Sequence, residues 1–334
     1  MSKHSELYNF LINKDKPSER VFFHPILMQF AARLLNCTYE EFMRDYRVLV
    51  ESNVKCLEVF DLDAVGLISD PYRETSAFGG TVEFNGNHPP VCAPLIHSLN
   101  EIESLVNPGV YHSERTRDRL KAAEYYKKLL GDDIPIIGWI EGPLAEAADL
   151  IGVNNLLTKL LMEPDFIQKL MNICMTTAKD FARAQVEAGC LVIGIGDAVC
   201  SQIDPDTYES MVLPLHQDLM EHIHSLGAFA KLHICGDITH LLDKIALTNT
   251  DILDLDWMVT FESAREACGP GTILCGNLDP VQCIQNKSSE VVLSDSIKLI
   301  EQLNGQRFIL SGGCEITVAT PVDNLLAMKK SCDA

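Results

Sequence analysis

The segment KLHICGD places His233 and Cys235 two residues apart at the end of an apolar run. On a β-strand, residues i and i+2 point to the same side, so we expect these two side chains to share one face. A second cysteine, Cys314 in SGGCE, follows a later apolar run. One imidazole and two thiolates form a ligand set that suits Zn²⁺, and three protein ligands with one exchangeable position are typical of catalytic zinc.

Two acidic residues, Asp256 and Glu315, are candidates for the fourth, exchangeable position. The chain has 12 cysteines, however, and free cysteines are often ordinary buried core residues. A purely structural role for the three residues therefore stays open at this point. Cys200 and Cys275 lie near the ends of other apolar runs and are further candidates for the same site.

Cys314 lies far from His233 and Cys235 in the sequence, so the three can bind one metal ion only if the fold brings the ends of their strands close together. Eight short apolar runs alternate with helical patterns, which is typical of parallel strands covered on both faces. The runs are RVFFHPIL, AVGLIS, PIIGWIEG, CLVIGIGD, FAKLHICG, ILDLDWMV, TILCGNL and RFILSGG. We predict an α/β fold, a (β/α)8 TIM barrel, in which the carboxyl ends of all strands surround one mouth. A doubly wound open sheet is the alternative, but no glycine-rich dinucleotide fingerprint follows the first run.

One segment after the second run, DPYRETSAFGGTVEFNGNHPPVCAP, interrupts this alternation. Its turn signals NG and PP around a short TVEF run predict a hairpin insertion lying over one barrel mouth. The longest helical pattern is expected to break at EPD, with Pro164 opening a new helix. Residues 1–19 are expected to form a helical N-terminal extension, and residues 1–334 a single barrel domain.

The net charge and the apolar content of the chain indicate which classes of binding partner to expect. The formal net charge is −20, from 47 acidic and 27 basic residues, and such a surface repels nucleic acid and anionic membranes. No apolar stretch is long enough to span a bilayer, and the first twenty residues contain no apolar core of a secretory signal. We therefore expect a cytoplasmic protein with reduced cysteines and no nucleic-acid or membrane partner.

Three carboxylates end other predicted strands: Asp70, Glu141 and Asp197. We expect them to line the mouth as catalytic residues that shape an acceptor site or take up a substrate proton. The alternative is that they are solvated loop carboxylates or helix N-caps. Arg73, just past Asp70, is a candidate to bind an anionic acceptor group, with an exposed loop arginine as the alternative.

Several stretches resemble the uroporphyrinogen decarboxylase superfamily, and together they cover nearly the whole chain. They are DAVGLISDPYRETSAFGG, EGPLAEAADLIG, GDAVCSQIDPDTYESMVLP, HICGD, LDWMVTFESAR, CGNLDP and SGGCEITVATPVDNLLAM. The resemblance implies a (β/α)8 barrel. Asp70 matches the essential aspartate of the decarboxylases, but their arginine-rich N-terminal signature is missing, since VFFHPILMQFAARLL contains only Arg33.

The zinc branch of this superfamily resembles the chain more closely. Corrinoid-dependent methyltransferases, including methylcobamide:coenzyme M methyltransferases, carry a His-x-Cys pair and a distant cysteine as zinc ligands. His233, Cys235 and Cys314 match that pattern in type and order. Asp256 is similar in position to an acidic residue that holds zinc in these relatives when substrate is absent. Relatives that act on aryl methyl ethers use two glutamates and a histidine, and the chain shows no such set.

The resemblance implies a zinc-dependent methyltransferase that moves a methyl group between a methylcorrinoid co-substrate and a small acceptor. A zinc-activated thiol would attack the methyl group and expel cobalt(I). No DxHxxG cobalamin motif occurs in the chain, so the corrinoid is expected on a separate carrier protein, and no corrinoid-binding residue is assigned. The alternatives are a cofactor-free decarboxylase that uses Asp70, a donor-side methyltransferase that methylates the corrinoid protein, and a non-catalytic binding protein.

Overall fold

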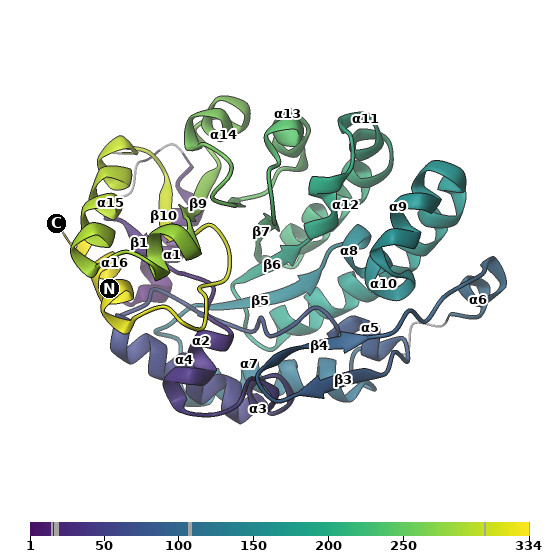
Figure 1. Cartoon of the computed structure of the whole chain (residues 1–334), viewed down its shortest axis with the longest axis horizontal. Coiled ribbons are helices and arrows are strands. Elements are labelled where there is room, and N and C mark those ends of the chain that lie inside the picture. The colour runs from purple at the N-terminus through teal and green to yellow at the C-terminus, as the bar shows by residue number, and fades with distance from the viewer. Residues whose placement is uncertain (15, 17–19, 106–108, 304, 334) are drawn as a thin grey trace.

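A computed structural model describes the chain except residues 15, 17–19, 106–108, 304 and 334. Eight parallel strands form one sheet in the hydrogen-bonded order β1-β10-β9-β8-β7-β6-β5-β2. This is the chain order of the strands read around a circle, so the sheet curls into a barrel (Figure 1). The strands are β1 Phe22–Phe23, β2 Val65–Gly66, β5 Ile136–Glu141, β6 Val192–Gly196, β7 Phe229–Ile234, β8 Ile252–Leu255, β9 Ile273–Leu278 and β10 Phe308–Gly312. Each lies within one of the eight predicted runs, and the (β/α)8 fold is confirmed.

Two very short strands, β1 and β2, form the ends of the hydrogen-bonded order, and one residue joins them. The N–H of Asp63 donates to the carbonyl of Phe23 at 3.1 Å, and Asp63 Oδ2 accepts from the Phe23 N–H at 2.7 Å. The Arg20 guanidinium pairs with both carboxylate oxygens of Asp63, at 3.0 and 2.7 Å. A buried carboxylate needs such a partner, so this pair stabilises the seam of the barrel.

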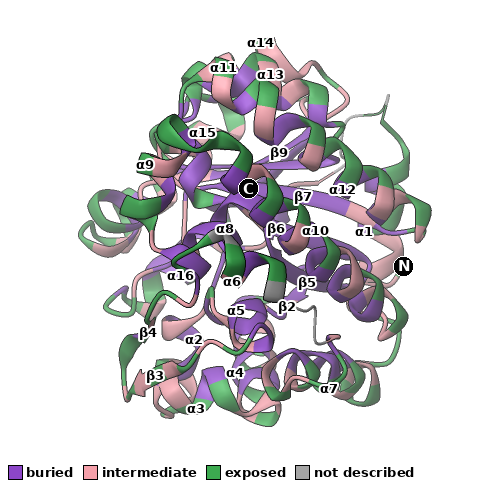
Figure 2. Cartoon of the chain, turned by 90° about the vertical axis from the view of Figure 1, so that its right-hand side faces the viewer, coloured by how far each residue is buried: buried purple, intermediate pink, exposed green. Residues whose placement is uncertain are grey.

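Helices connect the strands and surround them, so that the strands are buried and the outer helix faces meet solvent (Figure 2). The helices are α1 Lys3–Ile12, α2 Gln29–Leu35, α3 Tyr39–Arg44, α4 Tyr46–Phe60, α5 Arg73–Ala77, α6 Leu99–Ser104, α7 Glu114–Leu130, α8 Pro143–Ile151, α9 Val153–Met162, α10 Pro164–Glu187, α11 Pro205–Thr207, α12 Leu213–Ser225, α13 Leu242–Ile245, α14 Phe261–Cys268, α15 Ser289–Gln302 and α16 Val322–Ser331. Five further short helical segments are η1 Ala198–Gln202, η2 Tyr208–Val212, η3 Thr239–Leu241, η4 Ala246–Thr248 and η5 Pro280–Gln285.

Helix ends follow the local sequence signals. The predicted break is confirmed, because α9 ends at Met162 and Pro164 opens α10, where the ring of proline fits the first helical turn. Within the part of the chain that the structure describes, none of the helices combines the length and the apolar character needed to cross a bilayer.

The predicted N-terminal helix, α1, covers the amino-terminal end of the barrel. Its buried side chains, Leu7, Phe10 and Leu11, join a cluster with residues at the start of the barrel strands, namely Phe22, Ala64, Ile137, Val192, Ile252, Ile273 and Ile309. Phe10 stacks on Phe22 with 4.8 Å between the ring centroids. The helical part of the predicted extension therefore ends at Ile12, and residues 15 and 17–19 lie outside the described residues.

The predicted hairpin insertion follows the second barrel strand. β3 Val82–Asn85 pairs antiparallel with β4 His88–Cys92, and Gly86 takes a positive φ of 57° in the turn between them. The turn is anchored on α3, since the N–H of Glu40 donates to the Gly86 carbonyl at 2.8 Å and the N–H of Tyr39 donates to Asn87 Oδ1 at 3.0 Å. The hairpin is thus held by α3, which belongs to the connection between β1 and β2.

The packing of α1 generates a first prediction. Phe10→Ala should lower the free energy of unfolding by about 3 kcal/mol, because a buried aromatic side chain leaves the barrel end. Equilibrium unfolding in urea, followed by circular dichroism, measures the change. Ile12→Ala on the same helix is the matched control, since Ile12 is 48% exposed, and it should cost less than about 0.5 kcal/mol. Equal losses in both variants would mean that α1 does not seal the barrel through Phe10.

Candidate metal centre

Three potential metal ligands meet at the carboxyl ends of the barrel strands. His233 lies near the end of β7, Cys235 follows β7, and Cys314 follows β10. His233 Nε2 is 3.0 Å from Cys235 Sγ and 3.9 Å from Cys314 Sγ, and the two sulfur atoms are 3.7 Å apart. The structure therefore brings together the three residues that the sequence selected, as one compact group of potential ligand atoms.

These distances fit a tetrahedral zinc site. With Zn–S bonds of about 2.3 Å and a Zn–N bond of about 2.0–2.1 Å, ligand atoms at tetrahedral corners lie about 3.5–3.8 Å apart. The sulfur–sulfur distance of 3.7 Å falls in that range, and the two nitrogen–sulfur distances of 3.0 and 3.9 Å bracket it. One imidazole and two thiols are also the donor atoms that zinc prefers. The group thus fits zinc both in geometry and in chemistry.

Glycines of β6 make room beside this group. Gly194 and Gly196 pair in register with Lys231 and His233 of β7. A Cβ on Gly194 would lie 2.3 Å from the indole of Trp139, so a larger residue there would displace the ring. The Trp139 ring instead packs across β6, with its centroid 6.4 Å from that of the His233 ring. The glycines therefore allow an aromatic side chain to support the imidazole.

The segment that carries Cys314 is fixed by a close backbone approach. The N–H of Gly313 donates to the carbonyl of Leu278 at 2.9 Å. A Cβ on Gly313 would lie 2.2 Å from the backbone nitrogen of Trp257, so glycine is required there. The loops that follow β8, β9 and β10 consequently pack against one another and hold Cys314 in place.

The other ring nitrogen of His233 faces β8. His233 Nδ1 lies 3.2 Å from the backbone carbonyl of Asp254 and 3.6 Å from its carboxylate. With the Nδ1 proton directed at Asp254, the lone pair of Nε2 points toward the two sulfur atoms. The ligating tautomer is therefore selected by the protein itself.

The three residues share protons in the metal-free protein. The adjacent Cys235 thiol lowers the pKa of Cys314 with help from His233, although burial acts in the opposite direction. Contact with Cys314, together with burial, raises the pKa of Cys235. Burial lowers the pKa of His233, but Cys314 and Asp254 outweigh it and raise that pKa to about 9. A metal ion that binds here displaces the protons that remain.

The two predicted candidates for a fourth ligand lie outside this compact group. The Asp256 carboxylate accepts from the N–H groups of Gly236 and Trp257, both at 2.6 Å. Glu315 Oε1 accepts from the N–H of Gln29 at 3.0 Å. The structure does not bring either carboxylate into the compact group, so the role of Asp256 as a ligand stays a prediction.

Asp70 is buried in a clamp of cations. Arg115 binds it with two parallel hydrogen bonds, Nη1 to Oδ1 at 2.9 Å and Nη2 to Oδ2 at 2.6 Å, and the Ser69 hydroxyl donates to Oδ2 at 2.7 Å. Burial alone would raise the pKa of Asp70, but the charge of Arg115 and, less strongly, of Arg73 holds that pKa well below its ordinary value. Asp70 is thus a paired internal anion and differs from the solvated carboxylate that was the alternative expectation.

Arg73 differs from both sequence-based expectations. It is fully buried, and its Nη2 donates to Glu141 Oε1 at 2.8 Å, while its Nε lies 3.6 Å from Glu74 Oε2. It is therefore neither an exposed loop residue nor open to an anionic acceptor. Burial raises the pKa of Glu141 well above its ordinary value; Arg73 offsets part of this rise, whereas Glu74 and Asp149 add to it.

Asp197 is fully buried and binds the start of α8. Its Oδ1 accepts from the N–H of Ala145 at 2.7 Å, and its Oδ2 pairs with His216 Nε2 at 2.9 Å. His216 Nδ1 in turn bonds the Tyr208 hydroxyl at 2.9 Å. Asp197, Cys200 and His216 form a second compact group of potential ligand atoms, but these bonds already occupy both His216 nitrogens and the Asp197 carboxylate. Asp197 therefore binds the first turn of α8, whose N-cap residue is Gly142, from the loop after β6, and it makes no side-chain cap bond to η1, which follows it.

Comparison with protein families matches the profile described as uroporphyrinogen decarboxylase (URO-D) to residues 11–334. The chain belongs to the uroporphyrinogen decarboxylase family. The resemblance seen in the sequence is thereby confirmed, and it extends from the end of α1 to the end of the chain.

Relatives within this family carry two different activities in their names. The methylcobamide:CoM methyltransferase MtbA of Methanosarcina mazei is 28% identical over 274 residues, which cover 81% of this chain and 79% of the relative. A uroporphyrinogen decarboxylase of Prochlorococcus marinus is 26% identical over 284 residues, with 82% and 80% covered. A solved methyltransferase structure from Methanosarcina mazei superposes with a TM-score of 0.90, covers 100% of this chain and 98% of that one, and is 22% identical, which supports the fold.

Three charged residues beside the predicted site residues received no role from the sequence: the buried Lys231 and Asp254 and the half-buried Arg115. A signal existed for Lys231, because it stands two residues before His233 on the same face of an otherwise apolar strand. Asp254 was visible only as one of two acidic residues at the end of its run. Arg115 belongs to α7, and nothing in its local sequence relates it to Asp70.

The metal centre generates a second prediction. Purified wild-type protein should carry about one zinc ion per chain, and Cys314→Ser should lose most of it, because one of three fixed ligands is removed. Elemental analysis by plasma mass spectrometry measures the metal. Cys332→Ser is the matched control, since Cys332 bonds the Met328 carbonyl in α16 and belongs to neither compact ligand group, and it should retain zinc. Wild-type protein without zinc after reducing purification would contradict the assignment.

The clamp on Asp70 generates a third prediction. Asp70→Asn should lower the free energy of unfolding by about 3 kcal/mol at neutral pH, because Arg115 is left without its counter-charge. The folded-state pKa of Asp70 is depressed, so its contribution is present above the unfolded pKa of about 4 and fades as the pH falls below it. Urea unfolding at a series of pH values should show the wild type and the variant converging in acid. Exposed Asp133→Asn should instead track the wild type throughout.

Proposed function

We propose that this protein is a zinc-dependent methyltransferase that moves a methyl group between a methylated corrinoid and a small thiol. The observation that carries the proposal is the meeting of His233 Nε2, Cys235 Sγ and Cys314 Sγ at separations of 3.0–3.9 Å. Membership of a family that includes methylcobamide:CoM methyltransferases adds support. The direction of transfer and the identity of the acceptor are left to experiment.

His233, Cys235 and Cys314 would hold the ion through one nitrogen and two sulfurs. Bound there, zinc would lower the pKa of a substrate thiol so that the thiol binds as a thiolate at neutral pH. Asp256, whose carboxylate is bonded to the backbone at Gly236 and Trp257, or Glu315 would complete the resting site, and the substrate sulfur would replace that exchangeable ligand. The donor set therefore suits thiol activation better than a closed structural site.

Position matters as much as activation in this reaction. A sulfur–carbon bond forms while a cobalt–carbon bond breaks and its electron pair stays on cobalt, so sulfur, methyl and cobalt must be aligned. A barrel of this size is filled by its own side chains, and a corrin ring cannot enter it. We infer that a separate corrinoid carrier protein presents the methyl group at the mouth, and that the reduced thiols suit a cytoplasmic setting.

The three carboxylates predicted to be catalytic would play different parts. Glu141 lies level with His233 in the strand register, with Gly196 between them, and burial raises the pKa of its carboxyl group above the ordinary value. Arg115 bonds both carboxylate oxygens of Asp70, and Ala145 and His216 bond those of Asp197, whereas Glu141 pairs with Arg73 through Oε1. We infer that Glu141 takes up the thiol proton, and that Asp70 and Asp197 position the surrounding loops.

The decarboxylase alternative has less support. It requires Asp70 to contact a tetrapyrrole, yet Asp70 is 4% exposed and clamped by Arg115. A donor-side methyltransferase, which methylates the corrinoid from a small donor, would have to use the same three ligands in this chain. It differs from the first proposal only in the direction of transfer, so one assay run in both directions separates the two.

The proposal is tested with zinc-loaded protein, methylcobalamin and a panel of small thiols. Wild-type protein should demethylate methylcobalamin in a thiol-dependent manner, visible in the corrinoid absorbance, and should yield the S-methyl product by mass spectrometry. Cys314→Ser should fall to the uncatalysed rate, whereas Cys332→Ser should match the wild type. Reaction of cob(I)alamin with methylated donors, but not of methylcobalamin with thiols, would reverse the direction. Decarboxylation of uroporphyrinogen by metal-free protein would instead favour the decarboxylase alternative.

A further inference from the structure

A buried ion pair lies next to the metal ligands inside the barrel. Lys231 is 2% exposed and Asp254 is 1% exposed, and Lys231 Nζ lies 2.8 Å from Asp254 Oδ2. Removing an ammonium and a carboxylate from water costs several kcal/mol for each group, and good geometry repays it only in part. Barrel interiors are normally filled by branched apolar side chains, so the pair calls for an explanation beyond packing.

Asp254 contacts the lysine and the metal ligand at the same time. His233 of β7 and Asp254 of β8 are paired in the strand register, and Lys231 stands two residues before His233 on the same face. The Asp254 carbonyl is 3.2 Å and its carboxylate 3.6 Å from His233 Nδ1. One aspartate therefore joins the ion pair to the imidazole.

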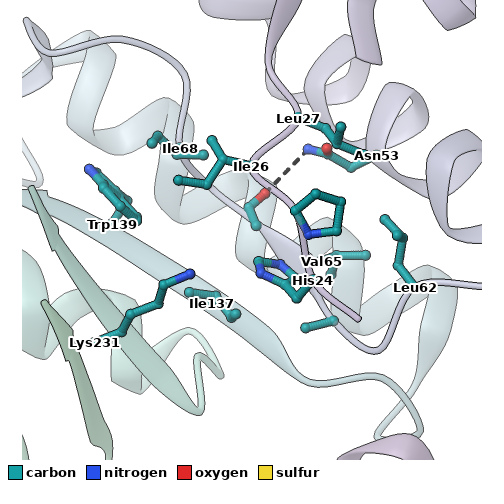
Figure 3. Close-up of a pocket in the computed structure, with 13 residues that line it drawn as sticks. His24, Ile26, Leu27, Asn53, Leu62, Val65, Ile68, Ile137, Trp139 and Lys231 are labelled. Carbon is teal, nitrogen blue, oxygen red and sulfur yellow. Dashed lines mark hydrogen bonds between the residues drawn. The ribbon is translucent and has the colours of Figure 1, made fainter. Parts of the chain in front are cut away.

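The surroundings leave Asp254 as the counter-charge of Lys231. On its other side the lysine reaches toward a cavity of about 20 Å³, where it faces the imidazole of His24 (Figure 3). Burial, followed by the charge of Lys231, lowers the pKa of His24 to about 3, so His24 is neutral and offers no negative charge. The Cys275 thiol, which lies against Asp254 and Lys231, has a pKa raised by burial and stays protonated.

We propose that Asp254, neutralised by Lys231, is the positioning residue for the His233 ligand. This inference rests on the proposed zinc site. The Asp254 carbonyl bonds Nδ1 at 3.2 Å, and the carboxylate 3.6 Å away places negative charge beside the ring, which makes the imidazole a stronger donor. Lys231 cancels the charge of Asp254, so that the pair orients the ligand without placing a further net negative charge beside a bound thiolate.

A positioning role and a merely structural role predict different variants. If the ion pair only fills space, Asp254→Asn and Lys231→Met break the same contact and should have the same effect on zinc. If Asp254 positions His233, only loss of the Asp254 carboxylate should weaken zinc binding. Lys231→Met keeps the carboxylate beside His233 and should bind zinc nearly as well as the wild type.

The test is the zinc dissociation constant, measured at fixed pH by competition with a chromophoric chelator. Asp254→Asn should weaken zinc binding about tenfold or more, whereas Lys231→Met should stay within about threefold of the wild type. The visible absorption of the Co²⁺-substituted protein should shift in Asp254→Asn and not in Lys231→Met. Lys179→Met removes an exposed ion pair with Asp218 and is the matched control, expected to change neither reading.

A double variant guards against simple misfolding. Asp254→Asn alone leaves a buried lysine without its partner and is expected to be destabilised. Lys231→Met/Asp254→Asn removes both charges, so it should unfold at a higher temperature than Asp254→Asn yet still bind zinc about tenfold more weakly than the wild type. Zinc binding restored to the wild-type level in the double variant would overturn the inference, as would equal loss in both single variants. A wild-type protein that binds no zinc would remove the proposed function and this inference together.

Discussion

A charge that is buried inside the barrel needs an opposite charge next to it. This requirement determines how side chains are arranged in the half of the molecule that holds the candidate metal ligands. Arg115 compensates Asp70, Arg73 compensates Glu141, and Lys231 compensates Asp254. Each pair joins different elements of the fold, so each also acts as a tether between them. These tethers of opposite charge add to the apolar core around the metal ligands, whereas the amino-terminal end of the barrel is packed against α1 through apolar side chains.

The metal ligands depend on this framework at two levels. The strand alternation and the order of strands around the barrel bring His233, Cys235 and Cys314 to one place. The finer fit comes from residues that make no contact with a metal: Gly313 allows the close approach of the Trp257 backbone, and Gly194 allows Trp139 to reach the imidazole. These glycines thus support the candidate metal centre because the absence of a side chain lets neighbouring groups pack close to the ligands.

Much of the fold and the ligand group could be predicted from the sequence, because both follow from periodic patterns. Apolar runs marked all eight strands, and the His-x-Cys spacing marked a shared face at the end of one of them. Burial of individual polar residues was harder to predict. Arg73 lies in a polar stretch and looks like a surface residue, yet it is fully buried. Its partners are Glu74, the next residue, and Glu141, which is 68 residues away in the chain but next to it in space.

The same limit applies to Asp197 and Lys231. The position of Asp197 at the start of α8 depends on His216 and on the start of a helix from another part of the chain, and no local pattern encodes that contact. Lys231 interrupts an apolar strand, which signals an unusual environment but not its partner. Topology predicts which strand ends meet, whereas pairing between side chains depends on three-dimensional distances that the sequence does not state.

The position of α1 affects the order in which the proposed substrates can bind. It covers the amino-terminal end of the barrel with Leu7, Phe10 and Leu11, so a molecule that reaches His233 and the two cysteines has to come through the opposite mouth. A small thiol and a bulky corrinoid carrier would therefore both have to approach the carboxyl-terminal mouth of the barrel. A docked carrier would cover this mouth of the barrel, so the small molecule would have to be bound already. If the proposed carrier docks there, its size alone would impose a compulsory binding order, in which the small molecule binds before the carrier and leaves after it.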